Sequence, residues 1–378
     1  MLKRIIATVL AATSLFCLAS CGKPLKKDYK IGIITGDAGL FPEEYNTALA
    51  LKEKYEGKVF VTQYPDPSKL KVGTPEIVNV ALKLADTNKP DAMIFAQAVV
   101  NTSDAVAAVK KKYPKMLIVC ASPEEEIKTI AEKADLVFAV DEASYAKQLV
   151  EKAKVNGAST FINYSFKRHT NNSLFAARNK AMEDACKNRK LKYVYVNSVD
   201  PRTYMGIEGA KRFIAEDISR KIKEYGKKTA FFSSDYLVQE QMVKSVVEYG
   251  AILAGTANPS PFTGFPGALD VKVTKEWDDG EAFIEPLINK AKGLKSEAKL
   301  STWSIPSGSL MLRAAVEYLS SYFDGKTEGT LDKEKITSTT LKLAGGDKYC
   351  TVGNYKADKD TVLKNCFTVF CKSTDLKS

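Results

Sequence analysis

The stretch Val137-Phe-Ala-Val-Asp-Glu142 lies at the centre of a repeated pattern in this chain. On each side of Asp141, short runs rich in apolar and β-branched residues alternate with longer stretches of helical spacing. Continuous apolar strands joined by helical crossovers are typical of parallel sheets that are covered on both faces. Because the β-α order repeats on both sides of Asp141, the sequence predicts an α/β protein of two doubly wound parallel-sheet lobes rather than one large sheet.

The predicted elements follow from these runs. Before Asp141, strands are expected over 30–35, 59–63, 92–97, 116–121 and 136–140, with helices near 43–55, 74–88 and 103–112. After it, strands are expected over 160–164, 193–197, 229–233 and 251–255, with helices near 143–155, 172–188, 206–225 and 237–249. A further helix is predicted over 308–323, where Leu312 and Leu319 belong to one apolar face.

The C-terminal third has a less regular pattern. Residues 256–267 are rich in turn formers and cannot form a helix. Beyond Gly325 no confident order of elements emerges. The sequence therefore predicts a first lobe over 29–141 (completed by part of 270–325), a second lobe over 142–268 and a C-terminal extension over 326–378.

The first residues have the features of an export signal. Lys3 and Arg4 precede an apolar stretch over 5–19, which is too short for a permanent membrane span, and the sequence Leu18-Ala-Ser-Cys-Gly22 follows. This ending resembles the bacterial lipobox, so we expect residues 1–21 to form a lipoprotein signal peptide that ends at a lipidated Cys21. An ordinary cleaved signal, in which Cys21 carries no lipid, is the alternative. Residues 22–28 would then be a tether, and the protein would be extracytoplasmic and anchored to the bacterial membrane by lipid.

The net charge of +11 raises the possibility of nucleic-acid binding. The lysines, however, are scattered over predicted helix faces, as at 110–112, and alternate with acidic residues. No basic stripe is interleaved with aromatic residues, and we expect neither a DNA-binding head nor a nucleic-acid partner. A mildly basic, solvated surface facing an anionic envelope explains the charge.

The cysteines do not suggest a metal centre. Cys120 lies in the apolar run 116–121 and Cys186 on a predicted helix, so both are expected to be buried thiols. Cys350, Cys366 and Cys371 cluster near the C-terminus, and outside the cell two of them could pair, with Cys350–Cys366 as the expected pair. The only histidine, His169, is distant from them in sequence, so no metal and no cofactor is predicted.

Ligands of open α/β sheets bind beyond the carboxyl ends of the strands, where loops and helix N-termini present hydrogen-bond donors. Two facing lobes would place both sets of strand ends in one cleft. The predicted ligand-binding residues are Thr35, Asp37, Phe41, Gln97 and Ser122 from the first lobe, and Tyr164, Phe166, Arg168, Asp200, Asp235, Tyr236 and Asn258 from the second. Aromatic rings with amides, carboxylates and one arginine suit a small polar ligand that has a flat or ring-shaped face.

Six of these residues also have a structural explanation. Arg168 is the strongest candidate, because a guanidinium recognises hydroxyl pairs or a carboxylate with fixed geometry, but it could be a surface arginine. Asp235 could only cap the helix that follows it. Asp37 and Asn258 could be turn residues. For Gln97 and Phe41, ligand contact and a structural role are equally expected.

An enzyme is not predicted. His169 has no accompanying nucleophile elbow, second histidine or paired carboxylates, so a general base is not indicated. A structural or solvent-facing role is expected for it, with contact to the cleft as the alternative. Trp277 and Trp303 are expected to be packing residues, and residues 302–306 could form a hinge strand beside the cleft.

The layout as a whole resembles the type I periplasmic binding proteins, the bilobal receptors of ABC transporters. Four segments carry the resemblance: 29–37, 137–142, 161–168 and 230–235. Arg168 matches an arginine of ribose-type receptors. The chain departs from that pattern at Gly36-Asp-Ala-Gly-Leu-Phe41, where those receptors have paired aromatics, and at Ser234-Asp235, where they have Asn-Asp. It is most similar to uncharacterised clostridial-type lipoproteins of this fold.

The resemblance implies a monomeric solute-binding protein that closes on a small polar ligand and docks on an ABC permease. A sugar or nucleoside is the first choice of ligand, and an amino acid or related small metabolite the second. An extracellular ligand sensor is the main functional alternative. An envelope enzyme and an adhesive lipoprotein without a ligand are weaker ones.

Overall fold

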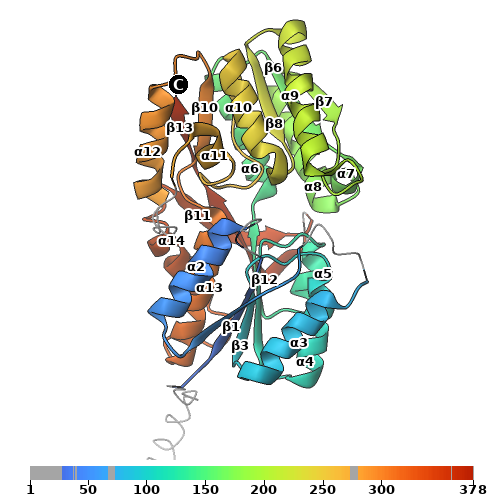
Figure 1. The fold of residues 1–378 in the computed structure, drawn as a ribbon. Helices are drawn as coiled ribbons and strands as arrows, with labels where there is room; N and C mark the ends of the chain where they lie inside the picture. Colours follow the sequence, from blue (N-terminus) through green and yellow to red (C-terminus); the bar gives the residue numbers. More distant parts are fainter. Residues whose placement is uncertain are drawn as a thin grey trace, which may run out of the picture.

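The computed structural model describes residues 28–36, 38, 41–66, 73–272, 280–358 and 360–377. These residues form two α/β lobes, one above the other in Figure 1. The predicted signal peptide with Cys21, nearly all of the tether, Asp37 and Trp277 lie outside the described residues.

Lobe 1 contains a seven-stranded sheet in the order β11-β12-β5-β4-β3-β1-β2. Its strands are β1 (Ile31–Thr35), β2 (Val59–Gln63), β3 (Ala92–Phe95), β4 (Leu117–Ala121), β5 (Leu136–Val140), β11 (Cys350–Lys356) and β12 (Val362–Cys371). The first five pair in parallel, β12 adds in parallel to β5, and β11 pairs antiparallel to β12. The buried apolar runs recognised in the sequence are these central parallel strands.

Lobe 2 contains a six-stranded sheet in the order β13-β10-β9-β8-β6-β7. Its strands are β6 (Thr160–Ser165), β7 (Lys192–Asn197), β8 (Thr229–Ser233), β9 (Ile252–Leu253), β10 (Lys299–Trp303) and β13 (Ser373–Lys377). All neighbours are parallel except β13, which runs antiparallel to β10 at the edge.

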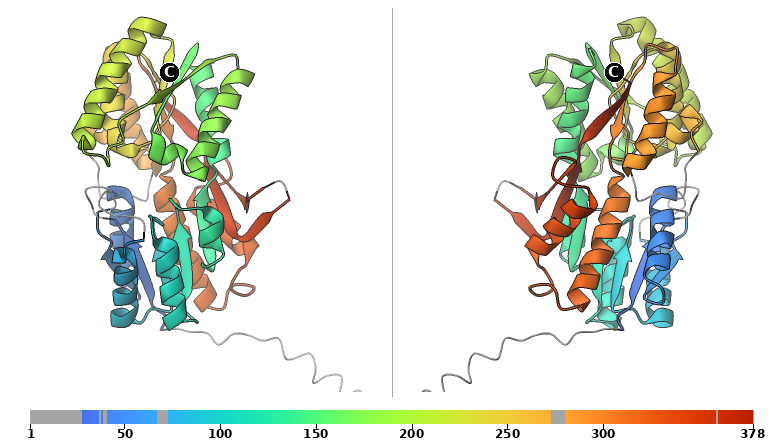
Figure 2. Two further views of the ribbon diagram at one scale, coloured as in Figure 1. Left: turned by 90° about the vertical axis from the view of Figure 1, so that its right-hand side faces the viewer. Right: turned by 90° about the vertical axis from the view of Figure 1, so that its left-hand side faces the viewer.

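Helices cover both faces of each sheet (Figures 1 and 2). Those of lobe 1 are α2 (Pro42–Lys54), α3 (Glu76–Asn88), α4 (Thr102–Lys112), α5 (Ile127–Ala131), α13 (Ser307–Phe323) and α14 (Lys333–Leu343). Those of lobe 2 are α6 (Glu142–Val155), α7 (Lys167–Thr170), α8 (Ser173–Asn188), α9 (Gly206–Tyr225), α10 (Gln239–Tyr249), α11 (Phe265–Leu269) and α12 (Gly280–Lys292). Each sheet thus has one apolar core on either side, which confirms the predicted doubly wound architecture.

Three segments connect the lobes: β5 leads into α6, β10 leads into α13, and β12 leads into β13. Two of them are tied together, because the backbone N–H and the hydroxyl of Ser304 both donate to the carbonyl of Lys372, at 3.3 and 3.0 Å. Trp303, at the end of β10, is fully buried, and its ring centroid lies 4.8 Å from that of Tyr145. Residues 302–306 therefore occupy one of the connections, and their action as a hinge beside the cleft stays a prediction.

The lobe boundaries differ from those predicted. Residues 326–378 are no extension: α14, β11 and β12 complete lobe 1, and β13 joins the sheet of lobe 2. Lobe 2 does not end at 268, because α12 and β10 also belong to it. The expectation that residues 256–267 cannot form a helix is wrong at their end, because α11 begins at Phe265 with Pro266 in its first turn. Of 270–325, it is α13 that completes lobe 1, where it packs on the sheet beside α2.

The expected Cys350–Cys366 pair is wrong. All five cysteines from Cys120 to Cys371 are free thiols in the structure. Side chains alternate between the two faces of a strand. Cys366 therefore joins the core beneath α3 and α4, whereas Cys350 lies in the core on the opposite face of the sheet, beneath α2 and α13.

The position of β12 generates a test of the C-terminal segment. Phe367 is fully buried in the lobe 1 core, whereas Val362 on the same strand is 49% exposed. Phe367→Ala should lower the free energy of unfolding by about 3–5 kcal/mol, because it removes a ring and leaves a cavity. Val362→Ala should change it by less than about 0.5 kcal/mol. Urea denaturation measures both, and equal small effects would show that this strand is peripheral.

Candidate ligand cleft

A cleft of about 670 Å³ lies between the two lobes. In lobe 1, the cleft is lined by the loops after β1, β3 and β4 and by the first turn of α2. From lobe 2 it takes the loops after β6, β8 and β9 and parts of α8 and α9. These are mostly the carboxyl ends of parallel strands, where this class of sheet binds ligands, and the volume suits a small organic molecule.

The structure brings most of the predicted site residues to this wall. The cleft is lined by Phe41, Gln97, Ser122, Arg168, Asp235, Tyr236 and Asn258. Phe166 and Asp200 do not line it but touch Arg168. Thr35 and Tyr164 are fully buried behind the wall, and the hydroxyl of Tyr164 donates to Asp217 on α9 at 3.0 Å. Ligand contact by the wall residues remains a prediction.

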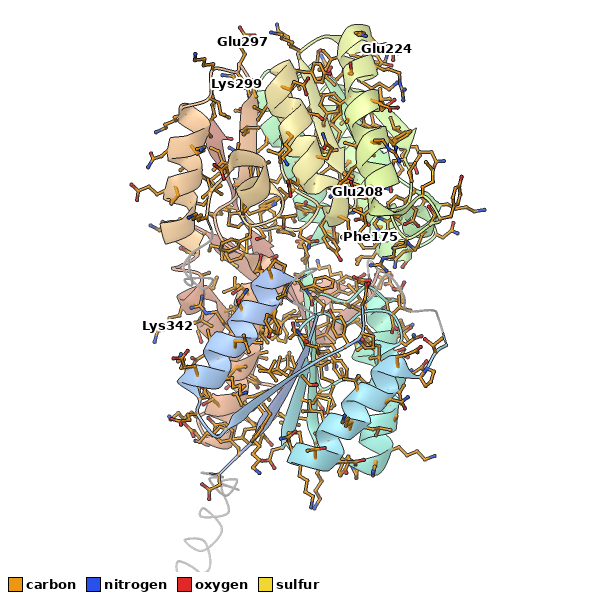
Figure 3. The ribbon with its side chains drawn as sticks, viewed as in Figure 1. Phe175, Glu208, Glu224, Glu297, Lys299 and Lys342 are labelled. Carbon is orange, nitrogen blue, oxygen red and sulfur yellow. The ribbon has the colours of Figure 1, made fainter. Side chains whose placement is uncertain are left out.

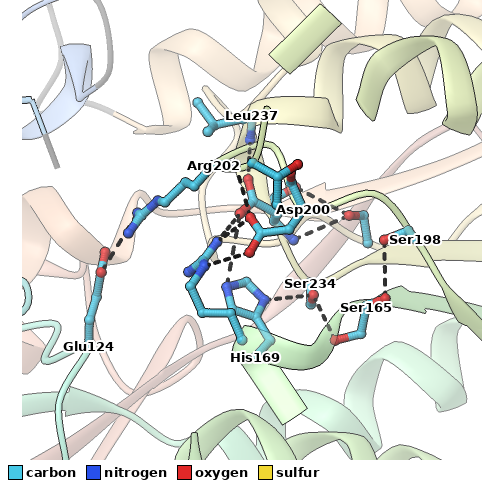
Figure 4. A network of polar contacts seen from close by, with 12 residues as sticks. Glu124, Ser165, His169, Ser198, Asp200, Arg202, Ser234 and Leu237 are labelled. Carbon is cyan, nitrogen blue, oxygen red and sulfur yellow. Dashed lines mark hydrogen bonds and ion pairs between the residues drawn. The ribbon is translucent and has the colours of Figure 1, made fainter. Parts of the chain in front are cut away.

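Arg168 is held in place from two sides. Its Nε and Nη2 donate to the two carboxylate oxygens of Asp200 at 2.9 and 3.0 Å, a bidentate pair (Figure 4). Its guanidinium carbon lies 4.8 Å from the centre of the Phe166 ring. Although burial opposes it, the hydrogen bonds from Arg168 hold the pKa of Asp200 below its usual value. The guanidinium is therefore preoriented and part of the cleft wall.

Asp235 has the capping role that was the alternative to ligand contact. Its Oδ1 accepts from the backbone N–H of Leu237 at 2.9 Å, at the start of the 3₁₀ turn Tyr236–Val238. It also lies 3.6 Å from Arg168 Nη2. Burial raises the pKa of this carboxyl. Capping and a place in the cleft wall are thus compatible in this residue.

His169 is almost fully buried, but it lines the cleft, the position that was the alternative to a purely structural role. Its Nδ1 lies 2.8 Å from the Ser234 hydroxyl, and its ring packs between Phe166 and Phe175 at 4.2 and 4.5 Å. Burial, with the neighbouring arginines, lowers the pKa of His169 to about 2. The imidazole is therefore neutral at physiological pH. This environment fits the structural role expected for it.

Two cleft carboxyls were missed from the sequence. Glu43 Oε1 accepts from the backbone N–H of Ser309 at 3.1 Å, and its other oxygen accepts from the Ser260 hydroxyl. Burial raises the pKa of Glu43 to about 7 and, together with the charge of Glu43, raises that of Glu44. A Cβ at Gly308 would collide with Glu44, so this carboxyl packs against the start of α13. The signal available in the sequence was Pro-Glu-Glu directly after a strand and its loop.

Arg178 is a third residue that the sequence analysis missed. It is only 2% exposed, lines the cleft from α8, and its Nη1 lies 3.3 Å from Glu142. Its Nη2 donates to the carbonyl of Ser234 at 3.4 Å. Its Nε is buried and has no hydrogen-bond partner among the described residues. A buried guanidinium N–H without a partner is costly, so a ligand acceptor here would be favourable.

The two lobes touch across the cleft. The Phe41 and Tyr236 rings lie 5.4 Å apart, and Tyr236 packs against a lobe 1 core. The Asn172 amide donates to the carbonyl of Glu124 at 2.8 Å, and Arg202 lies 3.8 Å from the Glu124 carboxylate (Figure 4). Figure 3 shows Phe175 at the edge of lobe 2 that faces lobe 1. The molecule is therefore in a closed arrangement.

Comparisons with known proteins agree with this architecture. A family model described as "Protein of unknown function (DUF3798)" matches residues 29–301. The chain belongs to this family. Two uncharacterised proteins of Treponema pallidum (strain Nichols) are 28% identical over 174 residues (46% of this chain, 81% of theirs) and 24% identical over 187 residues (48% and 84%).

Solved structures give the fold. A putative transcriptional regulator from Clostridium difficile 630 has a TM-score of 0.73 at 21% identity and covers 92% of this chain and 99% of its own. A sugar ABC transport substrate-binding protein from Bordetella parapertussis 12822 has a TM-score of 0.54 at 11% identity (94% and 90%). An arabinose-binding protein from Geobacillus stearothermophilus has a TM-score of 0.53 at 12% identity (82% and 92%). The fold is that of the type I periplasmic binding proteins, as predicted. Among the described residues no helix has the length and apolar character to cross a membrane.

The single histidine permits a direct test of the cleft's electrostatics. NMR of the folded protein should show His169 as neutral imidazole from pH 8 to pH 5, because its folded pKa is about 2. In urea the same residue should titrate near 6.5. Below pH 6.5 the unfolded chain binds a proton that the folded chain does not. The contribution of His169 to stability should therefore fall as pH decreases, by about 1.4 kcal/mol per pH unit. A folded-state midpoint between pH 5 and 8 would contradict the buried environment.

Proposed function

We propose that this protein is an extracytoplasmic, lipid-anchored solute-binding protein that delivers a small polar ligand to an ABC permease. The observation that carries the proposal is the cleft between two separately folded lobes, lined by strand-end loops from both. Connections through three chain segments permit hinge closure, which is how such folds respond to ligands. A non-enzymatic role is part of the proposal, and it is supported by the packed ring and lowered pKa of His169, which make this imidazole a weak base.

The cleft wall supports a ring-shaped polar ligand. Phe41, Tyr236 and Phe175 offer aromatic surface from both lobes, and Arg168 and Gln97 offer hydrogen bonds of fixed direction. A sugar or nucleoside fits this mixture best, and the Bordetella and Geobacillus neighbours are named for sugar transport and arabinose binding. An amino acid or related small metabolite is the second choice, since arginines and carboxyls both face the cleft.

Ligand binding would act by a shift between open and closed populations. Contacts such as Phe41 with Tyr236 and Asn172 with Glu124 form only when the lobes approach each other. A ligand that bonds to both lobes adds to these contacts and favours closure, and the permease would dock on the closed form. A membrane-bound sensor could use the same closed form. Pull-down of a permease with the liganded protein would favour transport.

The first test identifies a ligand and then removes one contact. Thermal-shift screening of the full chain in detergent against sugars, nucleosides and amino acids should reveal a binder that raises the unfolding midpoint. Arg168→Ala should then weaken binding of that compound about ten- to more than a hundredfold by calorimetry, since a charged hydrogen bond is worth roughly 1.5–3 kcal/mol. The matched control is Arg189→Ala, a half-exposed arginine on the same lobe that pairs with Glu151. Unchanged affinity in the Arg168 variant would remove that residue from the site.

The second test concerns the anchor. Cys21→Ala should move the protein from the membrane fraction to the soluble fraction of the producing bacterium, because a lipidated N-terminus holds a domain to the bilayer. Cys17→Ala, four residues earlier in the apolar stretch, should remain in the membrane fraction. Metabolic labelling with a tagged fatty acid reports the lipid directly. Labelling that persists in the Cys21 variant would show that the lipid is attached elsewhere.

A further inference from the structure

Two cysteines face each other near a connection between the lobes. In the antiparallel pair β11–β12, Cys350 is directly opposite Cys371. The backbone N–H of Lys372 donates to the carbonyl of Tyr349 at 2.8 Å, so the ladder hydrogen bond joins the residues that flank this pair. Cys350 and Cys371 therefore form a non-hydrogen-bonded pair, in which Cα atoms lie about 4.5 Å apart. That separation falls within the range of roughly 4.4–6.8 Å found for disulfides.

The side chains of Cys350 and Cys371 also point to the same face of the sheet, as a disulfide requires. Both belong to the lobe 1 core beneath α2 and α13, and both are fully or almost fully buried. The Cys350 Sγ donates to the carbonyl of Thr351 at 3.6 Å. The neighbouring Cys371 thiol, although burial opposes it, lowers the pKa of Cys350. Cys366, five residues earlier on β12, lies on the other face of the sheet and cannot reach either thiol without reversing the strand.

We propose that Cys350 and Cys371 form a disulfide in the mature protein. The thiolate of Cys350 attacks a disulfide oxidant, which forms a mixed disulfide and releases one thiolate of the oxidant. The thiolate of Cys371 then attacks Cys350 Sγ and releases the second. Two protein thiols are oxidised, the oxidant is reduced to two thiols, and the two protons pass to the released thiolates. Because both sulfurs are buried in the folded protein, the exchange takes place while the strands are still assembling.

The disulfide would fix one end of a hinge segment. Cys371 is the last residue of β12, Lys372 connects the lobes, and Ser373 begins β13 in lobe 2. A bond from Cys371 to β11 would hold the lobe 1 end of this segment in register while lobe 2 moves. It would also restrict the unfolded chain by closing a loop over residues 350–371, which raises stability. Outside the cytoplasm, disulfides form and persist, so its presence in cells rests on the proposed location.

The test is peptide mapping of the full chain isolated from the producing bacterium and alkylated before digestion. We expect one non-reduced peptide pair that contains Cys350 and Cys371, with Cys120, Cys186 and Cys366 alkylated. A reductant should lower the thermal midpoint by about 5 °C. Cys350→Ala combined with Cys371→Ala should abolish this shift by reductant. Cys366→Ala, the matched control on the same strand, should retain it.

A second measurement tests the Cys350–Cys371 bond independently of the compartment in which the protein resides. The full chain refolded with a mixture of reduced and oxidised glutathione should form the same bond without any cellular machinery. Free thiols at both positions after such refolding, or a bond that includes Cys366, would overturn the proposal. A bond that forms in this mixture but is absent from protein isolated from cells would support the pairing and contradict the extracytoplasmic location.

Discussion

The position of the cleft depends on the tied connections between the lobes. Each parallel sheet ends in loops at its carboxyl edge, but the two edges face each other only if the chain passes between the lobes at fixed places. Ser304 and Lys372 bind two of these segments together, and buried Trp303 packs beside the third, where α6 begins. Because the segments are short and joined, the lobes have few ways to move other than opening and closing.

The arginines of the cleft are each paired with a nearby carboxylate. Arg168 is paired with Asp200, Arg178 with Glu142, and Arg202 with Glu124. Among the described residues no ion pair is found for Glu43; burial raises the pKa of its carboxyl to about 7, and the carboxyl accepts a backbone N–H at the N-terminus of α13. A ligand would therefore be recognised by the direction of hydrogen bonds more than by net charge.

The sequence predicted those elements whose signal lies within a few consecutive residues, and it missed those that depend on contacts distant in the chain. The strands β1, β3, β4, β5, β6 and β8 are short runs that are almost entirely buried, and such apolar runs are visible without any tertiary information. β12 was missed because it alternates half-exposed and buried residues, and its partner β5 lies more than two hundred residues earlier in the chain. The expected Cys350–Cys366 bond was wrong for a related reason. Proximity in sequence does not reveal the face of the sheet on which a side chain lies.

For the cleft residues too, the sequence predicted what depends on local position and missed what depends on tertiary packing. The rule that ligands bind beyond strand ends located Arg168, Tyr236 and Gln97, because loop residues there can scarcely avoid the cleft. The rule did not hold for Tyr164, because this residue lies within β6 and its side chain points to α9. It also missed Arg178 on α8, since which helical residue reaches the cleft depends on how the helix packs.

The closed arrangement explains one departure from ribose-type receptors, namely the absence of paired aromatic residues in the first loop. Those receptors were expected to place paired aromatics in the first loop, and this chain has only Phe41 near that position. Tyr236 approaches Phe41 from the opposite lobe, to 5.4 Å between ring centres. An aromatic pair is therefore assembled from both lobes rather than from one loop. Under the proposed function, this pair would form only when the lobes meet, so the protein itself would contribute part of the closing energy and a ligand would supply the remainder.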